Sequence, residues 1–414
     1  MSINQNPKTG LRKICLLSDH HLSMNPRLWK EAFFYEKEGF EVIILTMWQS
    51  KDSLEKDFQI LAGHAISYQS YLNLIPGVVN PISRFFYRAR KKLAGQLQKY
   101  SKISTRWAIS HSPEKMFSRA MQEKADLYSA HLECAFFVGR DLIKAGKKVS
   151  FDFEDWYSRD YLVPERPVKL LATLESFALG NGLFCTAASQ SMASALEDCY
   201  PSKNSITVLY NGFSASIEEL FISYLNSNID KSSFNLLWFS RTIGPDRGIE
   251  LLIKGLLVLD IPVSLHLLGE MSEGYESILQ STFPFDKGHN LVIHPFIPHS
   301  QLTSFISQFK IGLAIEENIN DNRQLTITNK ILQYLQSGLM VLASDTEGQR
   351  EVAGFLSHSV TIVDIGKPIE IATAIKAMSQ KESSLKNSHN NQFEEIFSWE
   401  AQEIKLNSLI EQYL

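Results

Sequence analysis

The sequence contains little cysteine, only four residues in 414. Cys15, Cys134, Cys185 and Cys199 form no Cys-x-x-Cys pair and no Cys/His cluster with zinc-site spacing. This pattern indicates neither a disulfide framework nor a structural metal site, and it fits a reducing compartment. We therefore expect a cytoplasmic protein with no metal site and no cofactor.

Long apolar runs and an excess of one charge are also missing. The longest apolar stretches, such as VIILTMW at 42–48, are far shorter than the roughly 20 residues that span a bilayer. The start of the chain, MSINQNPKTGLRK, has no apolar segment of signal-peptide length, so no secretion is expected. A net charge of −4 argues against a nucleic-acid partner and favours a small ligand.

The length and composition are those of a folded protein with two domains. Apolar residues make up 44% and charged residues 21% of the chain, as in globular proteins. A chain of 414 residues fits two domains of about 200 residues each. Both halves are therefore expected to fold around their own cores.

Short, continuously apolar runs alternate with helical patterns in the first half. They predict strands at 13–18, 41–46, 124–131, 147–153, 182–189 and 205–212. Such strands are typical of a doubly wound parallel sheet that helices cover on both faces. The pair Asn211–Gly212 and the polar stretch up to Ser233 indicate a boundary, which gives an N-terminal domain at 1–212.

The second half repeats this alternation and predicts a second parallel-sheet domain at 213–390. Its predicted strands lie at 235–240, 262–268, 291–296, 310–315, 340–345 and 359–364. An amphipathic helix near the end, in the segment 391–414, could close the second domain or cross back to the first. The fold class is thus α/β, with two Rossmann-like domains.

Two arginines follow the first strand of the second domain, in the loop Arg241-Thr-Ile-Gly-Pro-Asp-Arg247-Gly248. Parallel sheets bind ligands beyond the carboxyl ends of their strands. Guanidinium groups pair bidentately with phosphate oxygens, and a helix N-terminus adds free N–H groups. The loop predicts a diphosphate site, although two solvated surface arginines would give the same pattern.

A second cationic segment lies at Thr328-Asn329-Lys330, directly before a helix. Thr328 or Asn329 is expected to cap that helix, and Lys330 to face the same crevice as Arg241 and Arg247. The plain alternative is an ordinary capped helix.

Several strings resemble family 4 glycosyltransferases, which have the GT-B fold of two Rossmann-like domains facing each other across a cleft. The donor-side strings are SRTIGPDRGIELLIKGL, LHLLGE and TNKILQYLQSGLMVLASDTEGQREV. In the first half, SDHHLSMNPRLWKEAFFYEKEGFEVIILT, DLYSAHLECAFFVG, FDFEDWY and TAASQSMASALEDCYPSKNSITVLYNGF are also similar to this family. The resemblance therefore covers nearly the whole chain.

The resemblance implies catalytic roles for three residues. Arg241 and Arg247 would hold the donor diphosphate and stabilise the leaving group, with Arg247 where the family usually has lysine. His131 falls on a histidine that contacts the transferred sugar or the acceptor, although a lone histidine at a strand end is often a buried core group. Asp19, His20, His21 and Asn25 follow the first strand and are expected on the acceptor side.

The sequence also departs from the family pattern. Two glutamates spaced eight apart are replaced by Leu325 and Gln333. Gln333 can still hydrogen-bond a ribose, whereas Leu325 cannot replace a carboxylate. Glu316 and Glu317 could serve the sugar hydroxyls or form a solvated pair, and the usual Asp-x-His-Glu segment here carries Glu154 and Asp155.

A basic and aromatic segment at 81–100 is the remaining feature. Its residues Arg84, Arg88, Arg90, Lys91 and Lys92 stand beside Phe85, Phe86 and Tyr87. Such a helix could make a peripheral contact with an anionic membrane that carries a lipid-linked acceptor, or be a solvated basic helix.

The sequence thus predicts a glycosyltransferase of the hexosyltransferase type. It would transfer a sugar from a nucleotide diphosphate sugar to a glycan or lipid-linked acceptor in polysaccharide or glycolipid assembly. The reaction would need no metal ion and would retain the anomeric configuration of the sugar. One rival is a catalytically degenerate GT-B subunit that binds or scaffolds. The other is a nucleotide-sugar epimerase of the same fold.

Overall fold

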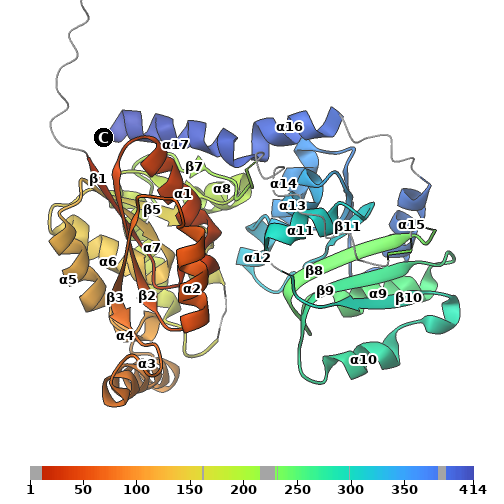
Figure 1. Cartoon of the computed structure of the whole chain (residues 1–414), viewed down its shortest axis with the longest axis horizontal. Helices are drawn as coiled ribbons and strands as arrows, with labels where there is room; N and C mark the ends of the chain where they lie inside the picture. Colours follow the sequence, from red (N-terminus) through yellow and green to blue (C-terminus); the bar gives the residue numbers. More distant parts are fainter. Residues whose placement is uncertain (1–11, 161–162, 215–228, 231, 298, 381–387) are drawn as a thin grey trace, which may run out of the picture. The chain divides into compact units, whose positions relative to one another are not determined.

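The computed structural model describes residues 12–160, 163–214, 229–230, 232–297, 299–380 and 388–414. It forms two compact units (Figure 1). Unit 1 comprises Met1–Ala188, Ala193–Leu209 and Leu406–Leu414, and unit 2 comprises Ser189–Met192 and Tyr210–Lys405. The main break lies between Leu209 and Tyr210, whereas the sequence places it after Gly212. Most of the polar linker expected up to Ser233 lies outside the described residues.

Unit 1 is built on a parallel sheet with the strand order β3-β2-β1-β4-β5-β6-β7 among the described residues. In the central register, Ile14 pairs with Val42 on one side and Leu127 on the other. The strands are β1 (Lys13–Leu17), β2 (Glu41–Trp48), β3 (Ser67–Asn73), β4 (Leu127–His131), β5 (Val149–Phe153), β6 (Cys185–Ala187) and β7 (Thr207–Val208).

Helices connect these strands and bury the apolar faces of the sheet. Phe136 of α6 (Leu132–Lys144), for example, lies 5.0 Å from Phe151 and 4.9 Å from Phe153 between ring centroids. The helices are α1 (Pro26–Lys37), α2 (Lys51–Ile60), α3 (Pro81–Ser101), α4 (Arg106–Ile109), α5 (Pro113–Glu123), α6 (Leu132–Lys144), α7 (Val168–Asn181), α8 (Gln190–Cys199) and, from Leu406 onward, α17 (Trp399–Tyr413).

Unit 2 has a second parallel sheet, with the order β10-β9-β8-β11-β12-β13. Its strands are β8 (Asn235–Ile243), β9 (Ser264–Met271), β10 (Asn290–His294), β11 (Ile311–Ala314), β12 (Met340–Ser344) and β13 (Val360–Val363). Its helices are α9 (Ile249–Val258), α10 (Tyr275–Thr282), α11 (His299–Ile306), α12 (Asp321–Leu325), α13 (Asn329–Gln336), α14 (Glu347–Phe355), α15 (Pro368–Ser379) and α16 (Ser388–Phe397). A buried core that includes Leu236, Trp238, Leu267, Leu313 and Leu342 joins these layers.

The predicted α/β class with two doubly wound sheets is confirmed. Every predicted strand is present, although the one expected at 205–212 shrinks to Thr207–Val208. Strand β3 was missed, because its polar sequence SYQSYLN lies at an edge of the sheet and is only partly buried. No helix among the described residues is long and apolar enough to cross a bilayer.

Both strand orders reverse direction beside the first strand of the unit. The reversal lies between β1 and β4 in unit 1 and between β8 and β11 in unit 2. In open parallel sheets, ligands bind beyond the carboxyl ends of the strands at such a point. The loops that follow β1, β4, β8 and β11 are therefore the places to search for a site.

Candidate functional site

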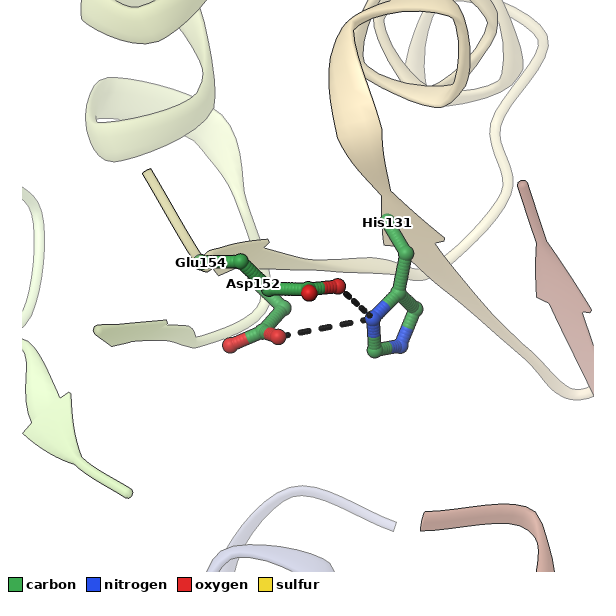
Figure 2. Close-up of side chains that lie close together, drawn as sticks. All are labelled: His131, Asp152 and Glu154. Carbon is green, nitrogen blue, oxygen red and sulfur yellow. Dashed lines mark hydrogen bonds and ion pairs between the residues drawn. The ribbon is translucent and has the colours of Figure 1, made fainter. Parts of the chain in front are cut away.

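A buried polar cluster lies at the carboxyl end of the unit 1 sheet. His131 ends β4, Asp152 lies in β5, and Glu154 follows that strand, so neighbouring strands deliver all three (Figure 2). Helix α1 adds Arg27 and Glu31, one turn apart on the same face. The parallel register of β4 and β5 therefore explains why His131 and Asp152 meet, and the packing of α1 adds Arg27 and Glu31.

Both ring nitrogens of His131 face carboxylates. Its Nδ1 lies 3.2 Å from Oε1 of Glu154 and 3.4 Å from Oδ2 of Asp152, and its Nε2 lies 2.6 Å from Oε2 of Glu31 (Figure 2 shows the first two). Burial opposes a charge on His131, but the charge of Glu31 and the bonds to Asp152 and Glu154 outweigh it and raise its pKa well above the usual value. His131 is therefore an imidazolium that donates from both nitrogens.

Arg27 balances the negative charge of the same cluster. Its Nε and Nη2 atoms donate to the two oxygens of Asp152 at 2.5 and 2.6 Å, and its Nη1 donates to the carbonyl of Leu209. Burial alone would raise the pKa of Asp152, but the charges of Arg27 and His131 hold it below its usual range. Arg27 and Asp152 thus form a buried, two-point ion pair.

The group His131, Asp152 and Glu154 also has a spacing that a metal ion could use, with ligand atoms within 4.8 Å of one another. Arg27, however, already donates to both oxygens of Asp152, and His131 lies against the same carboxylate. Two organic side chains therefore share this carboxylate group.

The predicted acceptor-side residues have different environments. Asp19 is buried and His20 is exposed, both directly after β1. The Nε2 atom of His21 accepts from the backbone N–H groups of Gln49 and Ser50, so its Nδ1 carries the proton and donates to Asp57 at 2.6 Å. His21 thus joins this loop to the start of α2, with both ring nitrogens engaged.

Asn25 connects the acceptor-side loop to the buried cluster. Its Oδ1 accepts from the N–H of Leu28 and caps α1, while its Nδ2 donates to Oε1 of Glu154 at 2.8 Å. The Glu154 side chain is 17% exposed, whereas His131 is fully buried. Glu154 is therefore the partly exposed member through which the cluster meets the surface.

Glu133 is a residue that the sequence analysis missed. Burial raises its pKa to about 6, the nearby charge of Asp19 acts in the same direction, and the ion pair with Arg166 at 2.5 Å opposes them. Between His131 and Glu133, Leu132 has φ of +69°, a left-handed conformation that is strained for a branched side chain. A shifted carboxyl group beside a strained backbone is typical of a functional site.

In unit 2, β8 contacts two of the predicted cations. Nη1 of Arg247 donates to Oγ of Ser240 at 3.1 Å, and Nζ of Lys330 lies 5.3 Å from the ring centroid of Trp238. Trp238 and Ser240 are two residues apart in one strand, about 7 Å along it. Arg247 and Lys330 therefore lie beside neighbouring positions of β8, and Arg241 follows as an exposed residue of the same strand.

Glu316 and Glu317 are occupied by groups of their own unit. Oε1 of Glu316 pairs with Lys330 and its Oε2 pairs with Arg323 at 2.6 Å, so both oxygens are engaged. Oε1 of Glu317 accepts from the N–H of Gly248, the N-cap of α9, at 3.0 Å. Glu316 therefore positions two cations. Glu317 occupies the N-terminus of α9, where the sequence predicts a diphosphate.

The start of α13 lacks a side-chain cap. Thr328 is its N-cap residue, yet its buried Oγ1 has no hydrogen-bond partner, and Asn329 is exposed. Gln333 is buried in the same helix. Leu325 is also buried, with its carbonyl accepting from Oγ of Ser189, so the position of the missing family carboxylate is apolar. The first-turn amides of α13 and the Thr328 hydroxyl are thus suited to an anionic or polar ligand.

The sequence analysis named Glu154 but missed Arg27, Glu31 and Asp152. Arg27, Glu31 and Tyr35 follow one another at i, i+4 and i+8, and all are buried, with Tyr35 donating to Glu31 at 2.6 Å. In the sequence, this spacing places polar side chains on the stripe that also carries Leu28. That irregularity in the apolar pattern could have identified Arg27 and Glu31, whereas Asp152 belongs to the string FDFEDWY.

Similarity to known proteins is visible in the fold. No protein-family model matches the chain, and no curated protein matches it in sequence. HepE of Anabaena, solved in complex with UDP, superposes with a TM-score of 0.67 at 16% identity, covering 97% of this chain and 100% of that one. Sucrose-phosphate synthase of Thermosynechococcus elongatus superposes with a TM-score of 0.69 at 14% identity, covering 97% of this chain and 98% of that one.

A putative UDP-N-acetylglucosamine 2-epimerase of Listeria monocytogenes superposes with a TM-score of 0.55 at 10% identity, covering 98% of this chain and 97% of that one. The two doubly wound units therefore have the GT-B fold.

Proposed function

We propose that this protein is a glycosyltransferase that moves a sugar from a nucleotide diphosphate sugar to an acceptor hydroxyl. The observation that carries the proposal is the arrangement around β8 in unit 2. Arg247 contacts Ser240, and Lys330 lies over Trp238 in the first turn of α13, which has no side-chain cap and an unpartnered Thr328 hydroxyl. Cations and free amides at a switch point are suited to a pyrophosphate.

The proposed chemistry follows from charge. When the sugar leaves the donor, negative charge develops on the departing nucleotide diphosphate. Arg241, Arg247 and the amides of α13 would stabilise that charge, and removing one such group typically costs about 10²–10³ in rate. Because these groups are organic cations and amides, the proposed reaction needs no metal ion. We further expect transfer of a hexosyl group with retention of its anomeric configuration.

The neighbouring structures support uridine as the first nucleotide to test. HepE is solved with UDP and also with UDP-glucose, the latter at a TM-score of 0.65 and 16% identity. We therefore choose UDP and UDP-glucose as the first ligands for this chain, followed by guanosine and adenosine diphosphates. The exposed Asn329 and the buried Gln333 are the proposed contacts to the sugar and ribose hydroxyls.

Unit 1 is proposed to bind the acceptor, a glycan or a lipid-linked sugar, for polysaccharide or glycolipid assembly. Asp19, His20, Glu133 and Glu154 follow β1, β4 and β5 at the carboxyl edge of its sheet. The buried His131 would position Glu154 rather than touch the substrate. All four cysteines are unpaired, which supports a cytoplasmic reaction.

Two rival functions have specific support. The apolar, buried Leu325 favours a degenerate subunit that binds a nucleotide sugar without transferring it. The likeness to the Listeria protein favours an epimerase. Product analysis separates them, because an epimerase isomerises the donor without an acceptor and a degenerate subunit leaves it unchanged.

The proposal is tested by thermal unfolding in the presence of nucleotides. A ligand at a hundred times its Kd stabilises the folded state by about 2.7 kcal/mol. We expect UDP or another nucleoside diphosphate to raise the Tm, and Arg241→Ala and Lys330→Ala to abolish the rise. Lys254→Ala, at an exposed position on α9, is the control. An undiminished rise in both site variants would refute the site.

A further inference from the structure

Helix α3, Pro81–Ser101, carries an exposed apolar face. Among the described residues, some of the most exposed large apolar side chains lie on it: Ile82 is 77% exposed, Phe85 72%, Phe86 58%, Leu93 61% and Tyr100 75%. We call these five residues the apolar stripe. The helix is drawn in orange at the lower end of unit 1 in Figure 1.

The spacing of the stripe shows that it is one surface. Its members recur at steps of three, one, seven and seven residues, which at 100° per residue places them within about 100° of the helix circumference. Ala94 and Gln98, the buried residues of α3, fall on the opposite side and face the protein. The stripe therefore points away from the unit that carries it.

The charge of α3 is of one sign. The sequence PISRFFYRARKKLAGQLQKYS holds six basic residues and no acidic residue, in a chain whose net charge is −4. Arg90 is paired with Glu114 at 2.8 Å and Lys99 with Glu165 at 2.8 Å. Arg88 and Lys92 are exposed and border the apolar stripe.

We infer that α3 docks unit 1 on an anionic lipid surface, with the apolar stripe in the interfacial layer and Arg88 and Lys92 against the headgroups. Helices of this kind bury their apolar face about 5–10 Å into the boundary between headgroups and acyl chains. The charge selects the occupant: anionic lipid headgroups complement the exposed Arg88 and Lys92, whereas the same helix of a second copy would bring charges of the same sign. Lipid binding itself needs no sugar transfer and so does not depend on the proposed function.

The position of α3 gives this contact a purpose. The helix follows β3, so it begins near the carboxyl edge of the unit 1 sheet, where Asp19 and Glu154 also lie. Docking there would bring a lipid-linked acceptor to the proposed acceptor side. This consequence rests on the proposed function, whereas the lipid contact does not.

Vesicle sedimentation of the full chain, without any nucleotide, tests the inference. We expect binding to phosphatidylcholine vesicles that contain phosphatidylglycerol, little binding to phosphatidylcholine alone, and loss of binding as salt rises. Each cation near an anionic surface contributes about fivefold in affinity, so Arg88→Glu/Lys92→Glu should weaken binding by at least about 25-fold. Phe85→Ser/Phe86→Ser should also weaken it strongly.

The control variant is Lys254→Glu/Lys287→Glu, which changes the net charge equally at exposed positions of unit 2 and should bind as the parent does. Equal losses in both charge variants would overturn the assignment to α3. A lipid-free dimer that Phe85→Ser/Phe86→Ser dissociates would show that a second copy covers the stripe. Unchanged Tm values and UDP binding in the variants would separate lipid docking from folding and from the donor site.

Discussion

The Nε2 atom of His131 lies 2.6 Å from Oε2 of Glu31, and the His131 side chain is fully buried. Since its Nδ1 faces Glu154 and Asp152, the ring bridges three carboxylates, and its raised pKa keeps both nitrogens protonated in the folded state. A buried imidazolium held in this way is a fixed positive charge of the scaffold. It links folding to pH in a direction that can be measured.

The first prediction is that the unfolding free energy falls as pH rises from about 6.5. Below that value His131 is protonated in both states, and its contribution is complete. Above it, the unfolded chain loses the proton while the folded chain keeps it, so stability declines until the folded pKa is reached. One such group gives a slope of up to about 1.4 kcal/mol per pH unit.

Urea unfolding at several pH values between about 6.5 and 8.5 measures this slope. His131→Gln should reduce it, and Glu31→Gln should end the decline at a lower pH, because the Glu31 charge is what chiefly raises the folded pKa of His131. If His131→Gln unfolds with the same pH slope as the parent, the ring is neutral and the imidazolium assignment is wrong.

The second prediction concerns Arg27 and Asp152. Arg27→Met leaves the Asp152 carboxylate buried without its two-point partner, and we expect a loss of about 3–5 kcal/mol in the unfolding free energy of unit 1. The double variant Arg27→Met/Asp152→Leu removes both charges and should recover much of that loss. Denaturant unfolding of both variants checks this, and a double variant no better than Arg27→Met would contradict it.

The predictable part of the fold has a physical basis. Strands β8, β9, β11 and β12 are buried on both faces, so their apolar runs identify them without any knowledge of partners. Strand β3 was missed because an edge strand needs no such run. Strands buried on both faces could therefore be predicted from the sequence, whereas the partly buried edge strand could not.

The candidate site was only partly predictable for a different reason. Arg247 lies in a loop and Lys330 in the first turn of α13, and both belong to local sequence motifs that suggested them. Arg27, by contrast, resembles a surface arginine until its partner Asp152 is known, 125 residues further along the chain. Likewise, the two roles of Glu316 and Glu317 depend on which neighbour each oxygen meets in space.

The third prediction assigns opposite effects to Glu316 and Glu317. The Glu317 carboxylate occupies the N–H of Gly248 at the start of α9, where it competes with a diphosphate. Glu317→Gln removes a negative charge worth about 0.3–1 kcal/mol at a helix N-terminus, so UDP should bind about two- to fivefold more tightly. Glu316→Gln instead leaves Lys330 and Arg323 without their shared partner and should lower the Tm and weaken UDP binding.

Titration calorimetry with UDP and thermal unfolding distinguish the two variants. Because both remove one charge from adjacent positions, each is the control for the other. Weaker UDP binding by Glu317→Gln would mean that this carboxylate assists the ligand, for example through a sugar hydroxyl. Tighter UDP binding by both variants would show that the change in net charge alone causes the effect, and would contradict the opposite roles assigned to the two glutamates.

The fourth prediction uses two glycines of helix α14. A Cβ atom at Gly348 would meet backbone atoms, lying 2.6 Å from the carbonyl oxygen of Thr326 and 2.8 Å from that of Leu325. Gly348→Ala must therefore push the segment that leads to Thr328 and α13. We expect a stability loss of about 1–3 kcal/mol from overpacking, together with weaker UDP binding.

Gly354 provides the matched control, because nothing lies within 4 Å of its added Cβ and it belongs to the same helix. Gly354→Ala should raise the unfolding free energy by about 0.5–1 kcal/mol, since alanine loses less conformational freedom in a helix, and should leave UDP binding unchanged. Denaturant unfolding and calorimetry measure both variants. If Gly348→Ala lowers stability but binds UDP with the affinity of the parent, then the start of α13 does not hold the nucleotide diphosphate.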